Sequence, residues 1–135
     1  MPTEILVVDD QELMRLGFRM VINSQPDLKV VGEAADGAQA ITASRVLRPD
    51  LILMDIRMPD VDGLQAARQI MREEPRAKII LVTTFDLGDY LQAGLAAGVR
   101  GFLLKDATPA QLLAAIRAVK TGEVVLPSLA LGHST

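Results

Sequence analysis

The sequence predicts an α/β fold, a doubly wound sheet of five parallel strands with five helices. Two observations support this prediction. Segments with the spacing of amphipathic helices alternate five times with short apolar runs. The runs are rich in Ile, Val and Leu without polar alternation, which is typical of strands that helices cover on both faces. Right-handed crossovers then favour the strand order 2-1-3-4-5, in which the winding reverses between strands one and three.

Each predicted element has a pattern and an end signal of its own. The apolar runs predict strands at about 5–8, 28–34, 51–54, 79–82 and 101–104. Helical spacing and turn residues predict helices at about 13–24, 37–47, 63–74, 86–97 and 109–121. Gly98 is suited to a left-handed cap after the fourth helix. The last helix has the strongest start signal, because Thr108, Pro109 and Gln111 combine a capping hydroxyl, a first-position proline and the Gln of a capping box.

Length and composition predict one domain followed by a linker. The chain has 135 residues, of which 50% are hydrophobic, enough for one core. We expect residues 1–121 to form the domain. Residues 122–135 are interpreted as a linker, because the stretch from Leu126 lacks helical periodicity and contains Pro127 and Gly132.

Charge and cysteine content exclude several classes of function. The formal net charge is -3 without a strong basic cluster, so we expect no direct binding of nucleic acid by this chain. The absence of cysteine excludes disulfides and thiolate metal sites. No basic region precedes the first apolar run and no run approaches membrane-spanning length, so we expect no membrane contact and a cytoplasmic location.

Polar residues with phosphate or metal chemistry follow four of the predicted strands. They are Asp9-Asp10, Asp55, Thr83 and Lys105. In a doubly wound sheet, the functional crevice lies beyond the carboxyl ends of the strands, at the point where the winding reverses. We therefore expect these five side chains to meet at one edge of the sheet.

This set of side chains predicts a phosphorylatable aspartate. Three carboxylates held together repel one another, and a divalent cation removes that repulsion. Oxygen ligands suit Mg²⁺, or Mn²⁺, which shares the preference for oxygen. A carboxylate can then attack a phosphoryl group, while the metal and a lysine neutralise its oxygens and a hydroxyl binds it.

Each residue taken singly has a simpler structural interpretation. Asp9 and Glu12 have the spacing of a helix-capping arrangement, and Asp55 could be a turn residue. Thr83 is an ordinary strand residue, and a lysine such as Lys105 is usually solvated. Their joint placement at four strand ends favours the phosphorylation site, because independent structural roles would rarely produce it.

The motif set resembles the receiver domain of bacterial two-component response regulators, over residues 4–121. The matching residues are Asp9-Asp10, Asp55 with the run 58–63 (Met-Pro-Asp-Val-Asp-Gly), Thr83, and the run 101–105 (Gly-Phe-Leu-Leu-Lys). The segments 83–86 and 101–106 are similar to the NarL/FixJ class, whose members usually carry a LuxR-type helix-turn-helix. The resemblance implies the flavodoxin-like receiver fold.

The resemblance also implies roles for individual residues. Asp55 would be the phosphoacceptor, Asp10 a direct Mg²⁺ ligand and Asp9 a mainly water-mediated one, with the backbone carbonyl of Arg57 as a further ligand. Thr83 and Lys105 would bind the phosphoryl oxygens. Phe102 corresponds to an aromatic switch position, although a buried strand Phe could equally be core packing.

A mechanism follows from the same resemblance. A sensor histidine kinase would phosphorylate Asp55, and the domain would catalyse only its own phosphorylation and dephosphorylation. The response would include dimerisation through the first and last helices and control of transcription through a helix-turn-helix domain beyond Thr135. Arg57 and Phe85 each lie two residues beyond a site residue, and we hypothesise that they lengthen the lifetime of the phosphoryl group. The alternative is that both are merely exposed.

Three other functions fit this sequence less well. A haloacid-dehalogenase phosphatase needs a second acid two residues after the nucleophile, where this chain has Arg57. A dinucleotide-binding module needs a glycine-rich turn after the first strand, where this chain has acids. A receiver-like adaptor that is never phosphorylated is disfavoured by the complete set of acids, hydroxyl and lysine.

Overall fold

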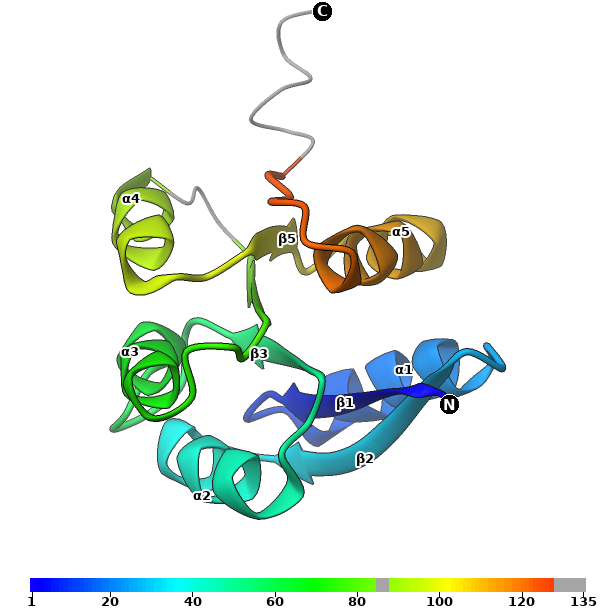
Figure 1. The fold of residues 1–135 in the computed structure, drawn as a ribbon, viewed down its shortest axis with the longest axis horizontal. Helices are drawn as coiled ribbons and strands as arrows, with labels where there is room; N and C mark the ends of the chain where they lie inside the picture. Colours follow the sequence, from blue (N-terminus) through cyan, green and yellow to red (C-terminus); the bar gives the residue numbers. More distant parts are fainter. Residues whose placement is uncertain (85–87, 128–135) are drawn as a thin grey trace, which may run out of the picture.

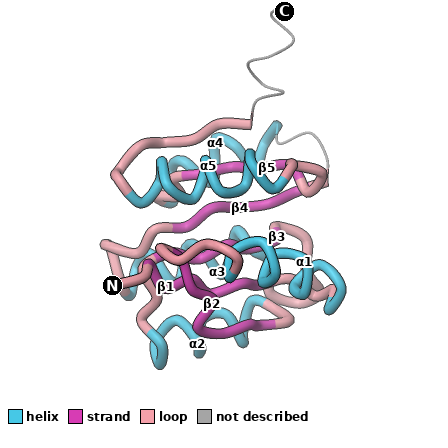
Figure 2. Tube along the Cα trace, turned by 90° about the vertical axis from the view of Figure 1, so that its right-hand side faces the viewer, coloured by secondary structure: helices cyan, strands magenta, loops and turns pink. Residues whose placement is uncertain are grey.

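The computed structural model describes residues 1–84 and 88–127 and contains one five-stranded parallel sheet (Figure 1). Its strands are β1 (Thr3–Val8), β2 (Leu28–Ala34), β3 (Leu51–Asp55), β4 (Ile79–Thr83) and β5 (Gly101–Leu104). Its helices are α1 (Glu12–Asn23), α2 (Gly37–Leu47), α3 (Gly63–Glu73), α4 (Gly88–Ala97) and α5 (Pro109–Lys120). The strand order is β2-β1-β3-β4-β5, which confirms the predicted topology. Figure 2 shows the strands following one another in that order, from β2 to β5.

The helices cover both faces of the sheet. Figure 1 shows α1 and α5 on one side and α2, α3 and α4 on the other. Each side encloses its own cluster of buried apolar side chains, one beneath α2 to α4 and one beneath α1 and α5. Two of the three inner strands, β3 and β4, are buried along their whole length, so their apolar runs reflect burial on both faces.

Short polar segments begin three of the helices. Asp36 caps α2 by accepting a hydrogen bond from the Gln39 amide, and α3 begins with a capping box of Asp62 and Gln65. The predicted capping box of α5 is confirmed, with Thr108 and Gln111 bonded in both directions. The N-cap residue of α1 is Gln11 and it makes no side-chain capping bond, so Asp9 and Glu12 do not form the alternative capping arrangement of this helix.

The chain continues along the free edge of β5 after α5 ends. Val125 forms a parallel bridge to Gly101, its amide donates to the Arg100 carbonyl (2.8 Å), and its carbonyl accepts from the Phe102 amide (2.9 Å). Leu126 packs against the cluster beneath α4, and Pro127 is buried. The packed unit therefore reaches Pro127 and includes the first part of the segment predicted as a linker. Pairing with the β5 edge is the reason, because an open strand edge presents unpaired amides and carbonyls.

The described helices have 10 to 12 residues, and no helix among residues 1–84 and 88–127 is long and apolar enough to cross a membrane.

Candidate functional site

The residues predicted for the site meet at the carboxyl edge of the sheet. Asp55 and Thr83 are the last residues of β3 and β4, while Asp9 directly follows β1 and Lys105 directly follows β5. Asp9, Asp55 and Thr83 are buried, although carboxyl and hydroxyl groups at strand ends are commonly exposed. Burying polar groups costs free energy unless other groups pair with them. Their burial at one place therefore indicates a functional site.

Lys105 supplies the main compensating charge. Its ammonium nitrogen lies 3.0 Å from Asp9 Oδ2 and 3.1 Å from Asp55 Oδ2, and its side chain is only 13% exposed. The Lys105 amide donates to the Thr83 carbonyl (2.7 Å), which fixes the lysine backbone beside the end of β4. A long contact of 3.5 Å joins the lysine to Gln11 Oε1. One ammonium group therefore bridges two buried carboxylates.

The acids form a group that fits a divalent cation. Asp9, Asp10 and Asp55 each present a carboxylate oxygen, and these oxygens lie within 4.8 Å of one another. Asp9 Oδ2 is buried and accepts no hydrogen bond among the described residues, so its charge is compensated by the Lys105 ion pair. Two of the acids are buried and Asp10 is exposed, which leaves the group open to solvent on one side. Hard oxygen donors of this kind suit Mg²⁺ or Mn²⁺.

The loop after β3 is packed directly behind Asp55. A Cβ atom on Gly63 would lie 2.1 Å from the Asp55 carbonyl oxygen, so only glycine fits there. The Gly63 amide donates to the Ile56 carbonyl (2.7 Å), and the Arg57 amide donates to Asp55 Oδ1 (3.3 Å). Asp60 turns the loop with a left-handed φ of 64°. The run 58–63 thus forms a short loop from β3 to α3 that packs against the Asp55 backbone.

The electrostatics of the site oppose ionisation of Asp55. Burial raises the pKa of the Asp55 carboxyl above its ordinary value, and the neighbouring Asp9 carboxylate adds to the increase, while Lys105 acts against both. Burial alone would lower the pKa of Lys105, but its ion pairs with Asp9 and Asp55 outweigh this and raise it. Lys105 therefore stays charged. Its single positive charge does not balance the three carboxyl groups of Asp9, Asp10 and Asp55.

Asp55→Asn is expected to stabilise the metal-free protein at neutral pH. A carboxyl whose folded-state pKa is raised favours folding only below its unfolded pKa, and this contribution is lost as the pH rises through the folded pKa. Removing the charge should raise the melting temperature by roughly 4 °C, for a gain of about 1 kcal/mol, because active-site acids often cost stability. Lys105 keeps Asp9 as its partner.

Thermal unfolding in chelator, from acid to neutral pH, measures this effect. The gain should shrink as the medium becomes acidic, since the wild-type carboxyl is then protonated. A melting temperature that is unchanged or lower in the variant at neutral pH would contradict the expectation.

The remaining residues of the predicted site have different surroundings. Phe102 is fully buried, with its ring against Gly94 of α4: a Cβ there would lie 2.8 Å from two ring atoms. Arg57 is exposed and lines, with Asp10 and Tyr90, an open depression of about 590 Å³ beside the acids. Phe85 lies outside the described residues, so its predicted position is not tested.

Two residues near the acids were not predicted from the sequence. Gln11 contacts Lys105, as described above, and Arg15 of α1 donates to the Asp9 carbonyl (2.7 Å). Both lie within six residues of Asp9, where a helix that starts at a strand end returns past that end. The only available signal was an arginine one turn into the first helix, which by itself is typical of many solvent-facing helices.

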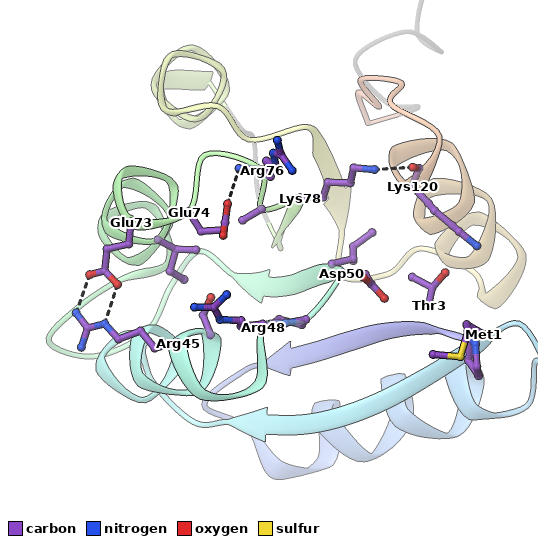
Figure 3. Close-up of a pocket in the computed structure, with 16 residues that line it drawn as sticks. Met1, Thr3, Arg45, Arg48, Asp50, Glu73, Glu74, Arg76, Lys78 and Lys120 are labelled. Carbon is purple, nitrogen blue, oxygen red and sulfur yellow. Dashed lines mark hydrogen bonds and ion pairs between the residues drawn. The ribbon is translucent and has the colours of Figure 1, made fainter.

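A cavity of about 630 Å³ lies at the opposite, amino-terminal edge of the sheet (Figure 3). Thr3 begins β1 there, and Asp50 and Lys78 directly precede β3 and β4. Several of its charged groups have partners in the structure. Figure 3 shows the two-fold Arg45–Glu73 contact and the bond from Lys78 to the Lys120 carbonyl. Arg45 and Gln69 lower the pKa of Glu73 to about 2, as in a surface ion pair. This cavity is separate from the group of Asp9, Asp10 and Asp55, which lies at the other edge of the sheet.

Comparison with known proteins agrees with the fold and identifies the family. The family model of the response regulator receiver domain matches residues 5–117. The chain belongs to this family, which is a signalling family and not a family of metabolic enzymes. Its relatives are regulators of the LuxR/NarL type.

Individual relatives support the same assignment. The chain is 47% identical over 121 residues to the transcriptional regulatory protein YxjL of Bacillus subtilis, covering 90% of this chain and 56% of that protein. It is 40% identical over 128 residues to LiaR of the same organism, covering 95% of this chain and 61% of that one. The chain thus spans about three fifths of the length of these relatives.

Solved structures share the fold. A LuxR-family response regulator from Aurantimonas sp. SI85-9A1 superposes with a TM-score of 0.88 at 32% identity, over 93% of this chain and 89% of that one. The response regulator domain of Thermotoga maritima CheB gives a TM-score of 0.84 at 33% identity, over 91% and 99% of the two chains.

Proposed function

We propose that this domain is a phosphorylation-activated switch in which Asp55 accepts a phosphoryl group from a sensor histidine kinase. The observation that supports this most directly is the environment of Asp55. Its carboxylate is buried at the end of β3, lies 3.1 Å from the Lys105 ammonium and shares an edge with two further acids. A purely structural aspartate has no need of this combination, since its burial raises its pKa and costs stability.

In the proposed reaction, an Asp55 carboxylate oxygen forms a bond to phosphorus. The bond from phosphorus to the donor breaks at the same time: a P–N bond when the donor is a phosphohistidine, and a P–O bond when it is acetyl phosphate. The histidine or acetate leaves with the electron pair. Transfer of this kind is governed by position and charge, which Lys105 supplies at the oxygens of the phosphoryl group. Attack of water on the acyl phosphate would later release inorganic phosphate and restore the carboxylate.

Asp9, Asp10 and Asp55, with the backbone carbonyl of Arg57, would hold Mg²⁺ or Mn²⁺. When bound, the ion supplies positive charge that neutralises the carboxylates and the phosphoryl oxygens. The chain's own geometry supports this assignment, because the oxygens of the three acids lie within 4.8 Å of one another. Among the described residues, the buried Asp9 Oδ2 has an ion pair with Lys105 but no hydrogen-bond partner.

Phosphorylation would act on the ends of β4 and β5. The new group adds about 1.5 to 2 negative charges and strong acceptor oxygens beside Thr83 and Lys105. We propose that the Thr83 hydroxyl donates to it and that Phe102 transmits the change. Phe102 packs against Gly94 in α4, so a shift of β4 and β5 would change the packing of that helix.

Magnesium-dependent incorporation of phosphate tests the function. The wild-type chain should gain one phosphoryl group from acetyl phosphate or phosphoramidate, as measured by intact mass, and the gain should disappear in chelator. Incorporation that ignores the chelator would contradict the proposed metal. No incorporation with any donor would favour the alternative of an adaptor that is never phosphorylated.

Dimerisation is the proposed output of this domain. Three apolar residues of α1 are exposed at helical spacing, namely Leu13 (79% exposed), Leu16 (37%) and Met20 (65%). The helix α5, with exposed Ala114, lies on the same face of the sheet (Figure 1). A two-fold pairing of this face would bury the apolar stripe.

Beryllofluoride with Mg²⁺, which mimics the phosphoryl group, is expected to shift the domain toward dimer in sedimentation experiments. A Leu13→Gln, Met20→Gln variant should stay monomeric, because it replaces the apolar stripe with polar groups. Val46→Gln is the matched control, since Val46 is 75% exposed on α2 at the opposite face of the sheet. Equal sedimentation with and without the mimic, across a wide range of concentrations, would remove dimerisation from the mechanism.

The domain limits and the wider setting are part of the proposal. Residues 1–121 are proposed as the receiver domain, and 122–135 as the connection to a helix-turn-helix domain that controls transcription, with a cytoplasmic location. The first part of this connection, up to Pro127, packs on the receiver domain along the edge of β5. The relatives named as transcriptional regulators, which are longer than this chain, support the assignment. The effect of Arg57 and Phe85 on phosphate lifetime stays a prediction.

A further inference from the structure

Arg15 links the backbone of Asp9, at the end of β1, to Glu33 on β2. Its Nη1 donates to the Asp9 backbone carbonyl (2.7 Å), and its Nε donates to Glu33 Oε1 (3.2 Å) on β2. The arginine side chain is only 17% exposed, so the guanidinium is held between a backbone carbonyl and a carboxylate. A planar guanidinium that binds two fixed partners has little freedom left to move.

The bonded carbonyl belongs to the peptide unit that joins the two acids. Asp9 is also fixed at its amide, which donates to the Ala34 carbonyl (3.1 Å), and at Oδ1, which accepts from the Gln11 amide (2.9 Å). Because peptide units are planar, fixing the Asp9 carbonyl also fixes the amide of Asp10. Arg15 therefore helps to fix the position of the Asp10 amide and Cα, from which the Asp10 side chain leaves the backbone.

We propose that Arg15 is a positioning residue for the metal site. It holds the Asp9–Asp10 peptide so that both carboxylates face the Asp55 carboxylate before a cation arrives, and Glu33 holds the guanidinium. The inference rests on the proposed function, because it concerns the magnesium affinity of that same site. Residues of this kind orient the groups that contact a metal, and their loss typically weakens affinity 10- to 100-fold.

Whether removing Arg15 weakens or strengthens the binding of Mg²⁺ distinguishes a positioning role from a simple effect of its charge. Arg15 is a cation near the acids, so removing it by electrostatics alone would strengthen the binding of Mg²⁺. Positioning predicts the reverse. Arg19 offers a matched control, because it also hydrogen-bonds Glu33, while only Arg15 bonds the Asp9 carbonyl among the described residues.

Calorimetric titration of the whole chain with Mg²⁺ tests the proposal. Arg15→Ala should weaken binding roughly 10-fold, and Arg15→Lys, which keeps the charge and loses the planar two-sided contact, should also weaken it. Arg19→Ala should bind as wild type or slightly tighter. The rise in melting temperature on adding Mg²⁺ is a second readout, and Arg15→Lys keeps the test valid if Arg15→Ala does not fold.

The outcomes distinguish this inference from the proposed function. If the wild type binds Mg²⁺ and both Arg15 variants bind it equally well or more tightly, the positioning role is overturned and the proposed function stands. Equal weakening by Arg19→Ala would also overturn it, because the effect would then belong to the Glu33 cluster. A wild-type chain without affinity for Mg²⁺ would overturn the proposed metal site and this inference together.

Discussion

Asp55→Asn is expected to abolish the incorporation of phosphate from acetyl phosphate. The amide has no anionic oxygen to attack phosphorus, while its shape leaves the packing of Gly63 against the Asp55 backbone intact. The loss should therefore be complete and should occur in a folded protein, which intact mass and thermal unfolding of the same sample would establish. Asp9 and Asp10 stay in place, but we do not expect them to replace Asp55 as acceptor, because in the proposed site they hold the metal.

Asp60→Asn is the matched control for this experiment. Asp60 is exposed in the same loop and has a left-handed φ of 64°, which asparagine adopts readily. It should be phosphorylated as wild type. Undiminished labelling of Asp55→Asn, or loss of labelling in both variants, would refute Asp55 as the phosphoacceptor.

Among the substitutions proposed for this chain, Lys105→Met is expected to lower the free energy of unfolding of the metal-free protein the most. Lys105 lies about 3 Å from both Asp9 and Asp55, and methionine of similar length keeps the packing but removes the charge. Breaking a buried ion pair on one side typically costs 3 to 5 kcal/mol, and we expect about 3 kcal/mol because Lys105 is partly exposed. Urea unfolding in chelator measures this loss.

Added Mg²⁺ should restore part of the lost stability of Lys105→Met. A cation among the acids supplies the positive charge that the variant lacks, so the gain from Mg²⁺ should exceed that of the wild type. Phosphorylation should remain impaired, because the ammonium that faces the phosphoryl oxygens is gone. Lys29→Met, at an exposed position of β2, is the control and should change little. Unchanged stability of Lys105→Met in chelator would contradict the charge balance described for the site.

The fold could be predicted because its signals are local. Strands buried on both faces require continuous apolar runs, and the runs of β3 and β4 stop at the residues Asp55 and Thr83 that end the strands. Once the strands are parallel, their carboxyl ends share an edge, so the meeting of Asp9, Asp55 and Lys105 follows from order along the chain. The sequence also specified the Thr108 capping box, whose partners lie within one turn.

What the sequence did not specify depends on tertiary contacts. Arg15 meets the Asp9 carbonyl only because α1 turns back past the end of β1, and Glu33 reaches it from β2. Val125 lies in the segment predicted as a linker, and its two backbone bonds to the β5 edge involve no side chain that a pattern could reveal. The burial of Asp9 likewise depends on packing around the site and not on the residue itself.

The pairing of Val125 with β5 determines where this domain can be joined to another. A fusion protein cut at Thr121, where helical periodicity ends, would remove the segment that covers the β5 edge and leave that edge open to other chains. A junction after Pro127 keeps it. The Phe102 amide is bonded to the Val125 carbonyl, so a grafted output module would remain physically attached to the strand that carries the proposed switch residue. Chimeras that exchange output domains should therefore take residues 1–127 as the transferable unit.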